Sequence, residues 1–186
     1  MKINVGISNR HIHLTEEDYK ILFGDIKLEK KNDLTQPGQY ACTNTVTIKG
    51  PKREINNVRL LGPLRSYTQV EISKTDSYTL GVNPPVRNSG DLLDAENITI
   101  IGPNGTIERK SCIIATRHIH ISHEDRVRLG LLDVEKVKIK TFTEKSTILE
   151  NVYLKELDNS FLELHLDTDD GNANLLKQGD LVEIIK

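Results

Sequence analysis

Paired histidines are the residues of this sequence whose type and spacing could do chemistry. The chain has six histidines, and four of them form two His-x-His pairs, His11 with His13 and His118 with His120. In an extended strand, side chains at i and i+2 point the same way, so each pair can aim two imidazoles at one point. Imidazole nitrogens are ligands for Zn²⁺ and similar metals. The spacing predicts two metal sites; the alternative is that a duplication copied both pairs for structural reasons.

Both pairs lie in a repeated block. Residues 10–18 read RHIHLTEED and residues 117–125 read RHIHISHED, which are identical at six of nine positions. The offset between the blocks is 107 residues in a chain of 186. Two copies so far apart indicate two related halves rather than a solenoid of many short repeats.

Each pair needs a third ligand, because a catalytic zinc usually has three protein ligands and one open position. His165, in FLELHLD, is the histidine outside the repeated blocks, and its polar strand face is also typical of a solvent-facing residue. Glu71, in LLGPLRSYTQVEIS, is the carboxylate candidate for the other pair. His123 has no counterpart in the first block, and we interpret it as a helix-surface residue.

The elements that would position these residues are mostly strands. After each His-x-His pair, Thr15 and Ser122 predict helix N-caps, and Gly24 and Gly130 predict the ends of short helices. Most other segments are short, β-branched or alternating, and separated by turn residues, with a hairpin expected at 103–105. The pattern predicts a mainly β protein of small antiparallel barrels with short capping helices.

The composition argues against several other classes. With 27 acidic and 25 basic residues the net charge is -2, which gives no overall attraction to nucleic acid or anionic membranes. Aromatic residues are 4% with no Trp, and no run approaches the roughly 20 apolar residues of a membrane helix. The first residues show no secretory signal. The cysteines, Cys42 and Cys112, suit free thiols in a reducing compartment. We therefore expect a cytoplasmic protein without nucleic-acid or membrane partners.

Six segments, which recur in order over nearly the whole chain, carry a family resemblance. They are SNRHIHLTEED, LTQPGQYA, LLGPLRSYTQVEIS, PVRNSGD, ATRHIHIS and LELHLDTDDGNA. Together they resemble the phosphate acyltransferase family of the propanediol-utilisation type, which transfers an acyl group between coenzyme A and phosphate. The resemblance implies two small interleaved β-barrels, one from residues 1–9 with 116–186 and the other from 10–115. We also expect a homodimer.

The resemblance implies two metal ions, normally zinc. The first site would have an open position for the coenzyme A sulfur, and the second would be completed by water or phosphate. The matching ligands are His11, His13 and Glu71 for the first ion, and His118, His120 and His165 for the second.

Two further residues match functional positions of the family. Arg65 matches an arginine that holds phosphate, and Ser89, in RNSGD, matches a serine near the reacting groups. One departure concerns location: family members that enter bacterial microcompartments carry an amphipathic extension before the first strand, whereas this chain begins almost at that strand. This difference predicts a cytosolic protein.

The resulting hypothesis is an acyltransferase that interconverts acetyl- or propanoyl-CoA and phosphate with acyl phosphate and CoA. Phosphate would attack the thioester directly with the help of metal, because burial should keep Cys112 a poor nucleophile. One alternative is a dinuclear metallohydrolase, which would need no phosphate. Another is a metal-binding module without catalysis, against which an anion-binding Arg65 argues.

Overall fold

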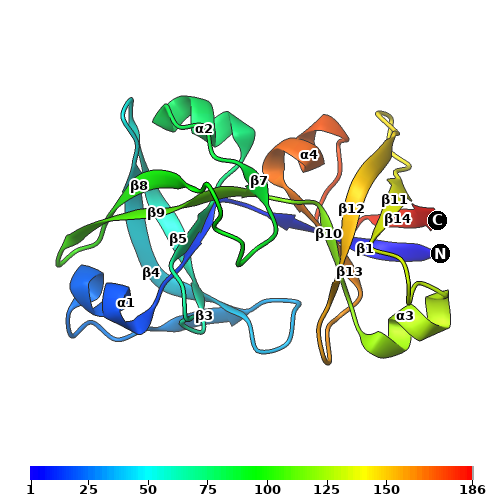
Figure 1. The fold of residues 1–186 in the computed structure, drawn as a ribbon, viewed down its shortest axis with the longest axis horizontal. Helices are drawn as coiled ribbons and strands as arrows, with labels where there is room; N and C mark the ends of the chain where they lie inside the picture. The colour runs from blue at the N-terminus through cyan, green and yellow to red at the C-terminus, as the bar shows by residue number, and fades with distance from the viewer. Residues whose placement is uncertain (186) are drawn as a thin grey trace. The chain divides into compact units, whose positions relative to one another are not determined.

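The structure is a computed structural model that describes residues 1–185 (Figure 1). It contains two compact units, Met1–Asn9 with Thr116–Lys186, and Arg10–Ala115. We call the first the terminal unit, because it holds both chain ends, and the second the middle unit. We propose that these units are the two domains of the protein.

The middle unit is built on a closed ring of six strands in the order β2, β5, β4, β8, β9 and β6. Their bounds are β2 (His11–His13), β4 (Tyr40–Lys49), β5 (Glu54–Gly62), β6 (Gln69–Glu71), β8 (Glu96–Ile101) and β9 (Thr106–Ala115). Two more strands, β3 (Lys30–Asp33) and β7 (Val86–Arg87), pair with β4 and β9. The helices of this unit are α1 (Glu16–Phe23) and α2 (Lys74–Leu80).

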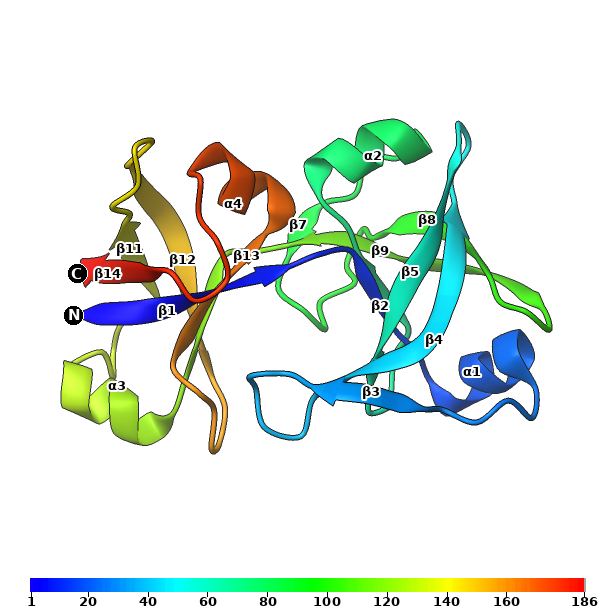
Figure 2. The ribbon, with the colours of Figure 1, turned by 180° about the vertical axis from the view of Figure 1, so that it is seen from behind.

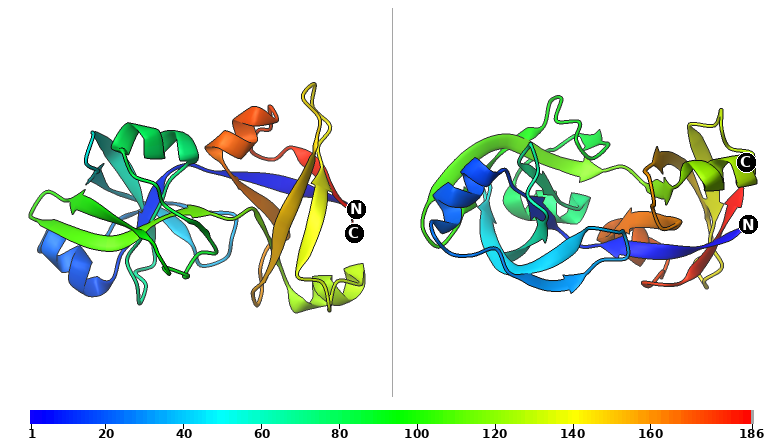
Figure 3. Two further views of the ribbon diagram at one scale, coloured as in Figure 1. Left: turned by 45° about the horizontal axis from the view of Figure 1, so that its top comes forward. Right: turned by 90° about the horizontal axis from the view of Figure 1, so that it is seen from below.

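The terminal unit is a closed barrel of six strands in the order β1, β13, β10, β12, β11 and β14. Their bounds are β1 (Lys2–Ser8), β10 (His118–Ile121), β11 (Lys136–Lys140), β12 (Ile148–Glu156), β13 (Glu163–Asp167) and β14 (Leu181–Ile185). Its helices are α3 (His123–Leu129) and α4 (Thr168–Ala173). Both ends of the chain lie in this barrel, where β1 and β14 are neighbours (Figures 2 and 3).

The two rings have the same strand order and the same strand directions. In each, the His-x-His strand pairs in parallel with one neighbour (β2 with β5, β10 with β12) and antiparallel with the other (β2 with β6, β10 with β13). The strands β6 and β13 pair in parallel with β9 and β1. The duplication therefore covers whole barrels, far beyond the block visible in the sequence.

The expectation of antiparallel barrels is wrong for these four parallel pairs. Hairpins such as the one at 103–105 do join antiparallel strands, as predicted. The parallel partners, by contrast, are joined through helices and further strands, and long connections of that kind permit parallel pairing. Turn signals in the sequence show the hairpins but do not show which distant strands become neighbours.

An exchange of first strands interleaves the two barrels. The strand β1 leads into the first His-x-His strand, but it pairs with β13 and β14 of the terminal unit. The strand β9 leads into the second His-x-His strand, but it pairs with β6 and β8 of the middle unit. Each half of the sequence thus contributes its first strand to the barrel that the other half forms, which confirms the predicted interleaving.

Alternation along the His-x-His strands separates core from site. Ile12 and Ile119, the residues between the paired histidines, are fully buried in the separate cores of the two units. The hydroxyls of Thr15 and Ser122 accept hydrogen bonds from the third residues of α1 and α3, which confirms the predicted N-caps. A strand and a capped helix therefore fix where each pair of histidines points. None of the helices in residues 1–185 has the length and apolar character needed to cross a membrane.

Two candidate metal centres

The middle cluster consists of His11, His13 and Glu71. Register between the antiparallel strands β2 and β6 places His11 opposite Glu71. The three side chains are buried, and each offers a ligand atom within 4.8 Å of the other two. His11 Nε2 lies 3.4 Å from Glu71 Oε2. The structure thus brings together the three residues that the sequence proposed for one ion.

The chemistry of His13 suits a metal. Its Nδ1 atom is buried and has no hydrogen-bond partner among the residues that the structure describes. Burial, helped by the nearby charges of His11 and Arg65, holds the pKa of His13 well below its usual value. The ring is therefore neutral and keeps a lone pair, as metal binding requires. Two imidazoles and a carboxylate form a ligand set that zinc accepts.

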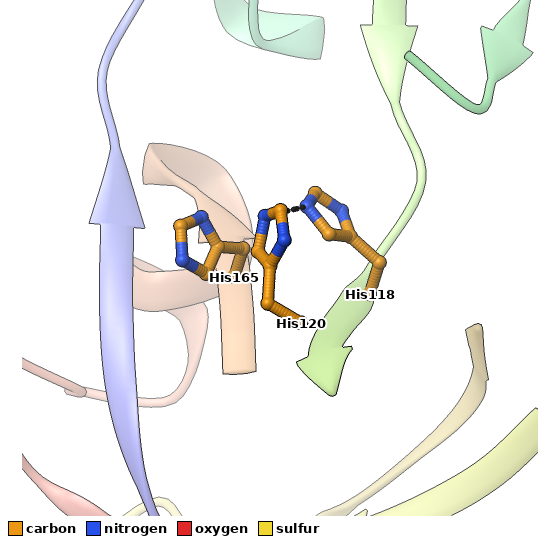
Figure 4. A group of neighbouring side chains, drawn as sticks. All are labelled: His118, His120 and His165. Carbon is orange, nitrogen blue, oxygen red and sulfur yellow. Dashed lines mark hydrogen bonds between the residues drawn. The ribbon is translucent and has the colours of Figure 1, made fainter. Parts of the chain in front are cut away.

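The terminal cluster consists of His118, His120 and His165 (Figure 4). Antiparallel register between β10 and β13 places His118 opposite His165. Again each side chain offers a ligand atom within 4.8 Å of the other two. His118 Nδ1 donates a hydrogen bond to the carbonyl of Thr116 at 2.8 Å, which leaves the lone pair on Nε2. This Nε2 atom lies 3.3 Å from Nε2 of His120. Nitrogens held this close suit ligation of one ion.

Glu71 and His165 occupy the same place in the two barrels. Each lies opposite the first histidine of its pair, on the strand that runs antiparallel to it. The sequence offered both as third ligands but not their equivalence, because their separation of 94 residues differs from the 107-residue offset of the repeat. A weak signal exists: an aspartate, Asp76 or Asp170, follows each of them by five residues.

Those aspartates take part in ion pairs that the sequence reasoning missed. Arg10 and Arg117, directly before the first histidines, each donate two hydrogen bonds to Asp76 and Asp170, at 2.7 to 2.9 Å. Each aspartate is the third residue of the helix that follows the third-ligand strand. Each bidentate pair therefore joins the start of a His-x-His strand to the helix that follows the third-ligand strand.

Arg65 and Ser89 lie beside the middle cluster and contact each other. Arg65 donates to Tyr67 Oη at 2.9 Å, to Gln39 Oε1 at 3.2 Å and to Ser89 Oγ at 3.4 Å. These partners are neutral, and Arg65 forms no ion pair with another residue in the range 1–185. A guanidinium without a carboxylate partner suits an anion such as phosphate.

Gln69 connects Ser89 to the cluster. Its Nε2 atom donates to Ser89 Oγ at 2.9 Å and to Glu71 Oε1 at 2.6 Å, and its Oε1 atom accepts from the backbone N–H of Gly90 at 2.7 Å. Sequence analysis missed Gln69, Gln39 and Tyr67. All three lie in segments that carry the family resemblance, and Gln69 also lies two residues before Glu71 in the same strand.

Several known proteins are similar to this chain over nearly its whole length. A sequence profile described as phosphate propanoyltransferase matches residues 4–177. A phosphate propanoyltransferase of Thermotoga maritima is 49% identical over 187 residues, which cover 99% of this chain and 89% of that protein. The phosphate propanoyltransferases of Priestia megaterium (48% identical, covering 96% and 83%) and Rhodopseudomonas palustris (42% identical, covering 100% and 83%) are also similar.

The fold and these relatives define an acyltransferase built on duplicated barrels. The chain belongs to the phosphate propanoyltransferase family, which confirms the resemblance carried by the six sequence segments.

Proposed function

We propose that this acyltransferase interconverts a short-chain acyl-CoA, acetyl- or propanoyl-CoA, and phosphate with acyl phosphate and CoA. The observation that carries the proposal is Arg65, whose guanidinium has neutral partners and connects through Ser89 and Gln69 to the histidine–carboxylate cluster. A structural metal site has no need for a cation of this kind beside it. The names of the relatives supply the substrate class.

Two divalent ions, zinc in this proposal, would be held by His11, His13 and Glu71 and by His118, His120 and His165. Bound metal would supply a Lewis acid for the thioester carbonyl and a position for the thiolate that leaves.

The protein side chains bind and orient phosphate. The planar fork of Arg65 offers donors that match two phosphate oxygens. Ser89 Oγ accepts hydrogen bonds from Arg65 and Gln69, which leaves its own hydroxyl hydrogen to donate to phosphate or to the acyl oxygen. A phosphate oxygen then attacks the carbonyl carbon, so that a C–O bond forms, the C–S bond breaks and sulfur keeps the electron pair.

We propose that this transfer is direct, without an acyl-enzyme. Burial raises the pKa of Cys42 to about 11 and that of Cys112 to about 12, so both are thiols at neutral pH. Ser89 contacts a guanidinium and an amide, and neither group can remove its proton. In CoA-free enzyme, labelled phosphate should therefore not exchange into acyl phosphate. Rapid exchange that Ser89→Ala abolishes would overturn the direct route.

The test of function is CoA release from acetyl-, propanoyl- and butanoyl-CoA at varied phosphate concentration. We expect release to require phosphate, whereas release without phosphate would favour the metallohydrolase and no release would favour the metal-binding module. Arg65→Lys keeps the charge but loses the fork, so we expect the KM for phosphate to rise about tenfold or more, with a smaller change for acyl-CoA. Arg53→Lys, at an exposed position of the same unit, is the matched control. Equal loss for both substrates would mean that Arg65 is structural.

We also propose that the protein acts in the cytoplasm, which the two free, buried thiols support. Cell fractionation tests this location. The homodimer stays a prediction, which analytical ultracentrifugation tests.

A further inference from the structure

The residue opposite the second histidine of each pair is a buried polar side chain. Register places Gln69 opposite His13 and Glu163 opposite His120. Gln69 is 0% exposed and Glu163 is 3% exposed. Each contacts the third ligand two residues further along its strand: Gln69 Nε2 lies 2.6 Å from Glu71 Oε1, and Glu163 Oε2 lies 2.8 Å from His165 Nε2. The two residues are equivalent in the duplicated barrels although their types differ.

The difference between Gln69 and Glu163 matches the difference between the third ligands that they contact. Where the third ligand is a carboxylate, its partner is an amide that can donate; where it is an imidazole, its partner is a carboxylate that can accept. Exchange of the two partners would place a carboxylate against Glu71, acceptor facing acceptor, inside a buried site. A carboxylate thus takes part at each site: Glu71 is itself a candidate ligand in the middle cluster, whereas Glu163 is the partner of a candidate ligand beside the terminal cluster.

The hydrogen bond determines which atom of each third ligand is left for a metal. A carboxylate accepts, so His165 Nε2 carries the hydrogen in its bond to Glu163 and Nδ1 keeps the lone pair. In Figure 4 one nitrogen of His165 is turned away from the rings of His118 and His120. In the middle unit, Gln69 binds Oε1 of Glu71, while Oε2 lies beside His11.

Gly6 of β1 supplies the space for the Glu163–His165 pair. It lies opposite His165 in the parallel register of β1 and β13. A Cβ atom at this position would lie 3.0 Å from Cδ of Glu163 and 3.3 Å from Nε2 of His165. These contacts are tighter than ordinary van der Waals contacts, so a side chain at position 6 would push the pair by a few tenths of an ångström.

We propose that Glu163 is a positioning residue that selects the Nε2–H form of His165, so that Nδ1 ligates the terminal ion. Gln69 has the equivalent task at Glu71 and leaves Oε2 as the ligating oxygen. This inference rests on the proposed metal sites and adds the two residues that set their ligand atoms.

The first measurement is side-chain ¹⁵N NMR of the histidines in the full-length, metal-free protein. We expect His165 as the Nε2–H form in the unsubstituted protein and in Glu163→Gln, whose amide oxygen can still accept. Glu163→Ala should give a mixture of the two forms. His165→Gln assigns the signal, and Glu144→Gln, on an exposed loop of the same unit, is the control. An Nε2–H form that persists unchanged in Glu163→Ala would overturn the inference.

The second measurement is zinc titration against a chromophoric chelator. Glu163→Ala should weaken one of two sites about 10- to 100-fold, Glu163→Gln should weaken it less, and Gln69→Leu should weaken the other site. Gly6→Ala should weaken the same site as Glu163→Ala. If Glu163→Ala does not fold, Glu163→Gln and Gly6→Ala decide, and unchanged affinity in both overturns the inference. Absence of zinc binding in the unsubstituted protein would instead refute the proposed metal sites, while the NMR result would still judge the role of Glu163.

Discussion

The middle and terminal barrels share strand order and strand direction. They also share the register that places a candidate third ligand opposite the first histidine of each pair. They differ in the loop that precedes the third-ligand strand. In both barrels this loop has six residues, 63–68 between β5 and β6 and 157–162 between β12 and β13. Arg65 is the third residue of the first loop, and Asn159 is the third residue of the second. The duplication thus kept the cluster geometry in both copies, whereas the cation suited to an anion is present in one.

The largest expected effect is the loss of one bound metal ion, and it should distinguish the two clusters. Protein purified without chelator should hold about two transition-metal ions per chain, as two three-ligand sites require. His118→Ala should remove the terminal ion and leave the other, because His11, His13 and Glu71 belong to a separate barrel. His13→Ala should do the reverse, and both should lower kcat/KM at least about 100-fold. Elemental analysis and the CoA-release assay measure these outcomes.

His123→Ala is the control for these ligand changes, because this exposed residue at the start of α3 lies in neither cluster. It should retain both ions and full activity. A metal-free protein with full activity would refute the comparison altogether.

A smaller effect should distinguish the arginine–aspartate pairs. The side chain of Asp76 is 6% exposed and that of Asp170 is 23% exposed, so loss of Arg10 strands the more deeply buried carboxylate. We expect Arg10→Ala to lower the free energy of unfolding by about 1–3 kcal/mol, and Arg117→Ala to lower it by less. Urea denaturation measures both. An equal or reversed order would show that burial of the aspartate does not govern the cost.

The smallest effect concerns the thiols, which both belong to the middle unit. With a pKa raised to about 11, Cys42 is about 0.1% thiolate at pH 8, so a disulfide reagent should react at least about 100-fold more slowly with native than with unfolded protein. Raising the pH should speed the reaction. Because the thiols report on the middle barrel alone, labelling in mild urea would show whether that barrel opens independently. Fast labelling of native protein at pH 8 would contradict the burial of these thiols.

Local sequence determined much of this protein. The His-x-His pairs, the helix caps at Thr15 and Ser122 and the hairpin at 103–105 each depend on neighbours a few residues apart, and such patterns are readable from sequence. The need for a third ligand at each pair pointed to His165 and Glu71, and the family segments matched both and added Arg65 and Ser89 as site residues. The structure places the first two in the clusters and the last two in contact with each other beside the middle cluster.

Tertiary structure alone decided which residues face one another. The equivalence of Glu71 with His165, and of Gln69 with Glu163, depends on the register of strands far apart in the chain, and no local pattern encodes that register. The same reason explains the unexpected parallel pairs and the burial of Glu163, whose strand looked merely polar on that face. A strand's alternation shows which side chains share a face, whereas the partner strand determines what that face meets.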